Sequence, residues 1–214
     1  MIKAVVFDWD GTLADTLPVH YMAFKQVLKD RFDFKPMDLY IREGKKSQEI
    51  IAEAAPGLAH DEVSELRKKK QELFRKLFVK RKLYPGVPEL LSRLKHDGFM
   101  LGLVTGTVRR NIEHTLSREL MALFDHITTA DDIQNSKPHP EPYQRCLTDL
   151  GVEPKESIAV ENAPLGIQSA KAAGMTCIAI ESTLPESYLK GADFVVKNLK
   201  EAGKLIESLA SGSG

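Results

Sequence analysis

The most informative stretch of this chain is residues 2–12, with the sequence Ile-Lys-Ala-Val-Val-Phe-Asp-Trp-Asp-Gly-Thr. Its first six residues are apolar and rich in β-branched side chains, with Lys3 as the only charge, which is typical of a strand buried on both faces. The run stops abruptly at Asp8 and Asp10, and Gly11 permits a tight turn directly after them. We therefore predict a buried strand over residues 2–7 with two carboxylates at its carboxyl end.

The same apolar signal recurs along the chain, and helical patterns separate most of its copies. Further strands are predicted over residues 99–104, 126–129, 157–160, 175–180 and 193–196. Helices are predicted over residues 88–96, 109–120, 140–150, 164–173 and 198–209. Strands that alternate with helices of about ten residues indicate βαβ units with right-handed crossovers. The predicted fold class is therefore α/β, with a doubly wound, Rossmann-like parallel sheet.

The region after the first strand breaks this alternation. Helices are predicted over residues 18–31, with Asp15 or Thr16 as N-cap, over residues 47–55, and from Asp61 onward, without a strand between them. Apolar residues recur in the last helix at three- and four-residue spacings, namely Val63, Leu66, Leu73, Phe74, Leu77 and Phe78. Tyr84, Pro85 and Gly86 then break the helical pattern. We expect a helical cap domain over residues 16–84, inserted into a core of residues 1–15 and 85–214.

The composition excludes several classes of protein. The 214 residues are 43% hydrophobic and carry 30 basic against 30 acidic side chains, so no overall charge points to nucleic acid or to a membrane surface. Residues 61–82 hold nine basic against four acidic side chains, which we interpret as the solvated face of an amphipathic helix. There is no signal-peptide pattern and no run of eighteen apolar residues, so we expect a cytoplasmic protein. Cys146 and Cys177 are expected to be buried thiols.

Residues that can bind or react with a ligand follow four of the predicted strands, directly after three of them and some residues beyond the strand over residues 126–129. In open parallel sheets, ligands bind outside the carboxyl ends of the strands, so we expect these residues to share one site. They are Asp8, Asp10, Thr105, Gly106, Lys137, Glu161 and Asn162.

These residue types suit the transfer of a phosphoryl group. Clustered oxygen ligands hold Mg²⁺, and a magnesium ion together with a lysine offsets the repulsion between a carboxylate nucleophile and an anionic phosphate. A carboxylate nucleophile gives an aspartyl-phosphate intermediate, and a second aspartate two residues on could move protons. A hydroxyl and backbone N–H groups around Thr105 and Gly106 could bind the phosphoryl oxygens.

Four motifs in order resemble those of the haloacid dehalogenase (HAD) superfamily, in its phosphatase branch. They are Asp-Trp-Asp-Gly-Thr-Leu-Ala-Asp-Thr at residues 8–16, Val-Thr-Gly-Thr at 104–107, Ser-Lys-Pro-His-Pro at 136–140 and Ala-Val-Glu-Asn-Ala-Pro-Leu-Gly-Ile at 159–167. Their order and spacing fit across essentially the whole chain. The position of the cap resembles the subgroup that contains phosphoglycolate phosphatase and β-phosphoglucomutase.

The resemblance implies a HAD-like core with a helical cap and assigns roles to individual residues. Asp8 would be the nucleophile and Asp10 the general acid and base, while the Asp8 side chain and the Asp10 backbone carbonyl would bind Mg²⁺. Thr105 and Lys137 would bind the phosphoryl group. The dehalogenase branch lacks the second aspartate of the first motif, so Asp10 favours phosphoryl transfer over dehalogenation.

One position departs from the family pattern. The fourth motif usually ends in two acids, whereas this chain has Glu161 followed by Asn162. An amide oxygen can coordinate Mg²⁺ but carries no charge, so Asn162 and Glu161 are both candidate metal ligands, and Glu161 is expected to bind the metal directly or through water.

The expected function is that of a Mg²⁺-dependent phosphatase acting on a small phosphomonoester, of the sugar phosphate or phosphoglycolate type. Two alternatives stay open: a sugar phosphomutase similar to β-phosphoglucomutase, and a non-catalytic binding module of the same fold. Substrate contacts from the cap are expected among His20, Arg42, Lys45 and Lys46. The expected partner is a small phosphorylated metabolite, with no nucleic acid and no membrane, and the expected state is a monomer.

Overall fold

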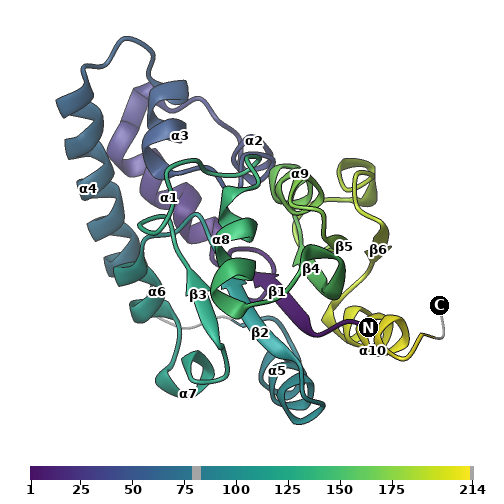
Figure 1. The fold of residues 1–214 in the computed structure, drawn as a ribbon. Coiled ribbons are helices and arrows are strands. Elements are labelled where there is room, and N and C mark those ends of the chain that lie inside the picture. Colours follow the sequence, from purple (N-terminus) through teal and green to yellow (C-terminus); the bar gives the residue numbers. More distant parts are fainter. Residues whose placement is uncertain (79–82, 213–214) are drawn as a thin grey trace.

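The computed structural model describes residues 1–78 and 83–212 and has an α/β core with helices on both faces of one sheet (Figure 1). Six parallel strands lie in the order β3-β2-β1-β4-β5-β6, so the order reverses beside β1, as in doubly wound sheets. The strands are β1 (Ala4–Asp8), β2 (Met100–Val104), β3 (His126–Thr128), β4 (Ser157–Glu161), β5 (Thr176–Ile180) and β6 (Phe194–Val196). The predicted fold class is confirmed, and each predicted strand is present with ends that differ by one or two residues.

The sheet is buried on both faces because successive side chains of β1 point into different apolar clusters. Val5 and Phe7 pack with helices α5 and α10, whereas Ala4 and Val6 pack with α8 and α9. This two-sided burial explains why residues 2–7 show no polar alternation. The four helices are α5 (Val87–His96), α8 (Glu141–Leu150), α9 (Pro164–Ala172) and α10 (Leu199–Ala210). The two cysteines are free and buried, as predicted.

One predicted core helix is wrong. The sequence predicts a single helix over residues 109–120, but the structure has two, α6 (Arg109–Thr115) and α7 (Arg118–Met121). The side chain of Ser117 accepts a hydrogen bond from the backbone N–H of Leu120 and so caps a new helix. The apolar spacing continues across this break, which is why the pattern alone did not reveal it.

Among the described residues between β1 and α5 there are four α-helices, which lie beyond the carboxyl end of β1 (Figure 1). We call residues 17–77 the helical insertion. Its own apolar cluster, which includes Phe24, Leu39 and Ile51, is separate from the two clusters of the sheet. The helices are α1 (Leu17–Leu28), α2 (Pro36–Tyr40), α3 (Ser47–Ala54) and α4 (His60–Leu77). Residues 79–82, which belong to the predicted cap, lie outside the described residues.

Two details of the helical insertion differ from expectation. The first helix ends at Leu28 rather than residue 31, and a 3₁₀ turn over Lys29–Arg31 follows it. Helix α2 was not predicted, because five residues are too few for a helical period to stand out. Within residues 1–78 and 83–212, no helix has both the length and the apolar character that a membrane crossing requires.

Candidate active site

The strand register brings the predicted site residues to one edge of the sheet. Asp8 pairs with Val104 of β2, and Phe7 pairs with Val160 of β4. Glu161 therefore lies at the level of Asp8 on β4, and Thr105 lies one residue beyond that level after β2. The carboxyl ends of β1, β2 and β4 thus place two carboxylates and a hydroxyl side by side.

Lys137 joins Asp8 to Glu161. Its Nζ atom lies 2.8 Å from Oδ1 of Asp8 and 2.6 Å from Oε1 of Glu161, and its side chain is 1% exposed. The hydroxyl of Tyr143 donates to the same oxygen of Glu161 at 2.6 Å. Burial opposes the charge on Lys137, but Asp8 and Glu161 outweigh it and raise the pKa of Lys137 well above 10.5. Lys137 is therefore a fixed cation at the site.

Asp8 is fully buried at the centre of this arrangement. Burial raises the pKa of Asp8 to about 8; Lys137 opposes this shift, and Glu161 and Asp10 add to it. Oδ1 of Asp8 accepts a hydrogen bond from Lys137, whereas Oδ2 has no hydrogen-bond partner among the described residues. A buried carboxylate oxygen without a partner is costly, so Oδ2 fits a position that a metal ion or a substrate completes.

Four side chains surround the carboxylate of Asp10. At Oδ1, the hydroxyl of Thr16 donates at 2.5 Å and Nε2 of His20 lies at 3.1 Å; at Oδ2, the hydroxyls of Thr105 and Thr107 donate at 3.0 and 2.8 Å. Burial opposes ionisation, but His20, Thr16 and Thr107 outweigh it and lower the pKa of Asp10 below 3.8. Thr16 stands at the N-cap of α1, as predicted, but its side chain makes no cap bond.

Lys70 extends this group into the helical insertion. Its Nζ atom lies 2.7 Å from Nδ1 of His20 and 4.4 Å from the ring centroid of Phe24. The residue is 2% exposed, so the interpretation of residues 61–82 as a solvated face is wrong at Lys70. Burial lowers the pKa of Lys70 to about 7. His20, expected as a substrate contact, lies between Asp10 and Lys70.

Asn162 is buried, and both polar atoms of its amide have protein partners. The hydroxyl of Thr12 donates to Oδ1 at 2.9 Å, and Nδ2 donates to the hydroxyl of Thr183 at 2.9 Å. Gly11 lies so close that a Cβ atom there would stand 2.2 Å from Nδ2. Asn162 therefore ties the turn after β1 to the segment after β5.

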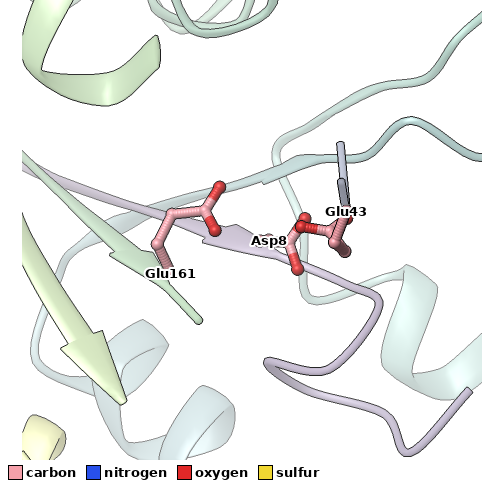
Figure 2. Close-up of side chains that lie close together, drawn as sticks. All are labelled: Asp8, Glu43 and Glu161. Carbon is pink, nitrogen blue, oxygen red and sulfur yellow. The ribbon is translucent and has the colours of Figure 1, made fainter. Parts of the chain in front are cut away.

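Sequence reasoning missed Glu43, which the helical insertion brings to the site. Glu43 is 6% exposed, and together with Asp8 and Glu161 it places three carboxylate oxygens within 4.8 Å of one another (Figure 2). The next residue, Gly44, packs on the core: a Cβ atom on it would lie 2.6 Å from Cδ of Lys137. A Cβ on the predicted phosphate-binding Gly106 would lie 2.9 Å from the carbonyl oxygen of Gly44.

The other residues expected to contact substrate from the cap have different positions. Lys45 and Arg42 pair with Glu53 inside the helical insertion. Lys46 donates to the backbone carbonyls of Ile133 at 2.6 Å and Gln134 at 3.1 Å, so it links the insertion to the core. A cavity of about 40 Å³ lies between insertion and core, and Lys45 lines it together with Asp10, His20 and Glu43. That volume holds little more than water.

The donor set fits a hard divalent cation. Carboxylate oxygens from Asp8, Glu43 and Glu161 converge, and Oδ2 of Asp8 and Oε2 of Glu43 are buried without hydrogen-bond partners among the described residues. Mg²⁺ prefers oxygen ligands of this kind.

Residues 5–180 match the model of the family described as haloacid dehalogenase-like hydrolase. The chain therefore belongs to the haloacid dehalogenase-like hydrolases, as its four motifs predicted. The expected enzyme class, a phosphoric monoester hydrolase of that family, is confirmed.

Three similar proteins illustrate the range of this family. The chain is 31% identical over 216 residues to validoxylamine A 7′-phosphate phosphatase from Streptomyces hygroscopicus subsp. limoneus, covering 94% of this chain and 96% of the relative. It resembles the structure of β-phosphoglucomutase from Clostridium difficile with a TM-score of 0.83, 25% identity, and coverage of 94% and 93%. It also resembles a CbbY variant from Rhodobacter sphaeroides in complex with xylulose-(1,5)bisphosphate, with a TM-score of 0.81, 27% identity, and coverage of 95% and 99%.

Proposed function

We propose that the chain is a Mg²⁺-dependent phosphatase that hydrolyses a small phosphomonoester through a covalent phosphoryl group on Asp8. The observation that carries this proposal is the pairing of Asp8 with Lys137 beside Asp10. Lys137 neutralises one oxygen of Asp8 while Oδ2 keeps no partner among the described residues. A nucleophile with one free oxygen next to a fixed cation can approach an anionic phosphate.

The reaction would proceed in two displacements at phosphorus. In the first, an oxygen of Asp8 attacks phosphorus, the bond to the ester oxygen breaks, and Asp10 gives that oxygen a proton as the alcohol leaves. In the second, water attacks the aspartyl phosphate, Asp10 takes a proton from the water, and the bond to Asp8 breaks. The hydrogen bonds around Asp10 favour its ionised form, which the second step needs. To act as the acid of the first step, Asp10 must therefore take up a proton from solvent when substrate binds and some of these hydrogen bonds are exchanged.

Asp8, the backbone carbonyl of Asp10 and Glu161 would hold the magnesium ion, with Asn162 next to Glu161. When bound, Mg²⁺ supplies positive charge that stabilises the phosphoryl oxygens and lowers their repulsion from Asp8. Lys137 supplies a second positive charge from the protein itself. Thr105 and Gly106 would bind the phosphoryl oxygens once Thr105 exchanges its bond to Asp10 for a bond to the substrate.

We propose that residues 16–84 act as a cap domain that opens to admit substrate, above a core of residues 1–15 and 85–214. The cavity beside Asp10 is narrow, which supports a movement of the helical insertion when a substrate enters. Closure would then exclude bulk water during transfer to Asp8. We further propose that the protein acts as a monomer.

The expected substrates are sugar phosphates or phosphoglycolate-type esters. Two relatives support this class, one named as the phosphatase of a 7′-phosphate and one seen with a sugar bisphosphate.

Phosphate release from a panel of phosphomonoesters tests the mechanism. We expect turnover that EDTA abolishes and Mg²⁺ restores. Asp8→Asn should lower it by at least roughly 10³-fold, because an amide cannot replace the carboxylate as nucleophile. Rapid acid quenching followed by mass spectrometry should detect the phosphoryl adduct on Asp8 in the parent protein.

Asp33→Asn is the matched control, since Asp33 is an exposed aspartate of the helical insertion. The circular dichroism spectra of the parent protein, Asp8→Asn and Asp33→Asn should be the same, which would show that all three are folded alike. Turnover by Asp8→Asn equal to that of Asp33→Asn would rule out Asp8 as nucleophile.

A phosphomutase is the second candidate, and the similarity to the β-phosphoglucomutase structure favours it. A mutase shares the residues around Asp8 but must return the phosphoryl group to the sugar before water reaches it. Conversion of β-glucose 1-phosphate to glucose 6-phosphate, primed by the bisphosphate and faster than phosphate release, would support the mutase. Release of phosphate without isomerisation would support the phosphatase.

A further inference from the structure

Asn162 leaves the carboxyl end of β4 with one carboxylate instead of two. Its amide is held by Thr12 and Thr183, so its position is set by the core rather than by a ligand. The neighbouring Glu161 is also engaged: Oε1 accepts from Lys137 and Tyr143, and Oε2 accepts from the backbone N–H of Asn162. Glu161 and Asn162 therefore offer less negative charge to a cation than a pair of free acids would.

Glu43 adds a carboxylate at the same place from a different part of the chain. Figure 2 shows its carboxylate next to that of Asp8, with Glu161 on the neighbouring strand. Oε2 of Glu43 and Oδ2 of Asp8 are both buried, and neither has a hydrogen-bond partner among the described residues. Two buried carboxylates this close repel each other unless a cation or a proton lies between them.

Packing holds Glu43 in this position independently of its charge. Gly44 adopts φ +95°, which L side chains rarely adopt, and its backbone lies against the side chain of Lys137 and against Gly106. A residue with a Cβ at position 44 would push the turn away from the core. The packing of this turn against the core therefore holds the carboxylate of Glu43 next to Asp8.

We propose that Glu43 is a ligand of the divalent metal and supplies, from the helical insertion, the carboxylate that Asn162 lacks. This inference deepens the proposed function, because it concerns the metal of the same site. Glu43 couples metal binding to the position of the insertion: the ion binds more tightly when the insertion is docked, and the insertion docks more firmly when the ion is bound. A protein with an acid at position 162 would not need this contact.

Metal binding without substrate provides the test. Mg²⁺ or Mn²⁺ alone is titrated into the protein, and calorimetry measures the binding. The fluorescence of Trp9 gives a second readout, because Trp9 is the single tryptophan, is buried, and stands between Asp8 and Asp10 in the sequence. We expect Glu43→Gln to weaken metal binding at least tenfold. The matched control is Glu49→Gln, because Glu49 also joins insertion to core, through the hydroxyl of Ser136 at 2.5 Å, but does not belong to the acidic cluster.

A second variant tests the compensation directly. Asn162→Asp should tighten metal binding, and in the Glu43→Gln background it should restore most of the lost affinity. Equal loss in Glu43→Gln and Glu49→Gln would overturn the proposal, because it would assign the effect to docking in general. Unchanged metal affinity with tighter binding of inorganic phosphate in Glu43→Gln would also overturn it, because Glu43 would then occupy the phosphate position.

These outcomes are independent of the proposed reaction. A protein that binds metal through Glu43 but releases no phosphate would contradict the phosphatase and leave the ligand assignment intact. A protein that releases phosphate but whose metal affinity does not change in Glu43→Gln would contradict the ligand assignment and leave the proposed phosphatase activity intact.

Discussion

The chain of contacts Asp10–His20–Lys70 places a buried lysine next to a buried imidazole. Lys70 lies 2.7 Å from Nδ1 of His20, and His20 lies 3.1 Å from Asp10. Burial lowers the pKa of His20, and Lys70 lowers it further, so the neutral ring accepts a hydrogen bond from Lys70 at Nδ1. Lys70 thus lowers the pKa of His20, and His20 in turn lowers the pKa of Asp10, the proposed acid and base.

At the residue scale, we predict that Lys70→Met stabilises the protein at neutral pH. The pKa of Lys70 is about 7 when folded and near 10.5 when unfolded, so between these values the unfolded state binds more protons and the stability rises with pH. Burial of Lys70 therefore destabilises the folded protein most at and below pH 7, and it has no such cost above about pH 10.5, where the lysine is neutral in both states. We expect Lys70→Met to raise the free energy of unfolding by roughly 2–4 kcal/mol at pH 7 and by much less at pH 10.

Urea unfolding at both pH values measures this difference. Lys69→Met is the control, since Lys69 is exposed on the same helix and should change the stability by less than about 0.5 kcal/mol at either pH. A Lys70→Met difference that stays constant with pH would show that Lys70 has an ordinary pKa.

At the scale of single elements, the turn over residues 41–44 connects α2 to α3 and carries both Glu43 and Gly44. Gly44 adopts a left-handed backbone and touches Lys137 and Gly106. Gly57, in the turn between α3 and α4, has a similar φ of +90° but has no atom within 4 Å of where a Cβ would lie. The two glycines therefore separate the cost of the backbone conformation from the cost of the contact with the core.

We predict that Gly44→Ala lowers kcat/KM by roughly tenfold or more, while Gly57→Ala leaves it within about twofold. Both substitutions carry the backbone penalty of about 1 kcal/mol, but only the first places a methyl group against Lys137. Steady-state kinetics together with thermal unfolding of both variants tests this. Similar kinetic losses in the two variants would contradict a role for the contact between Gly44 and the core.

At the scale of the whole molecule, the helical insertion is docked on the core by contacts on two sides. Lys46 and Glu49 contact the segment that leads to Lys137, through Ile133, Gln134 and Ser136. On another side, Arg75 of α4 donates to Oδ1 of Asn111 at 2.7 Å. The docked insertion therefore contacts the same loop that carries Lys137, the fixed cation of the site.

We predict that Lys46→Ala shifts the protein toward an open form. Loss of two hydrogen bonds from a charged donor costs about 1–3 kcal/mol of docking energy, so the radius of gyration from small-angle scattering should rise and kcat/KM should fall roughly tenfold. Lys68→Ala, which removes an exposed pair with Glu65 within α4, should change neither quantity. Scattering and kinetics identical to those of the parent protein would refute this docking role for Lys46.

The amino-acid sequence by itself determined the sheet and most of the side chains that meet at the candidate site. Short apolar runs that alternate with helical patterns indicate strands buried on both faces, and parallel strands end at one edge, so the residues after each run were expected to meet. Asp8, Asp10, Thr105, Lys137 and Glu161 were located in this way. Thr16 and Thr107 lie inside the same motifs and could have been added from them.

Only the tertiary structure decided which residues the helical insertion contributes. Lys70 is indistinguishable from its exposed neighbours Lys68 and Lys69 in sequence, and Glu43 belongs to no periodic pattern. Both are buried because the insertion docks on the core, and that docking joins segments distant along the chain through contacts that local propensity does not encode. The same holds for Asn162, whose partners Thr12 and Thr183 come from two other turns. The grouping of core side chains could thus be predicted from strand ends, whereas the charges that surround this group depend on how the helical insertion packs on the core.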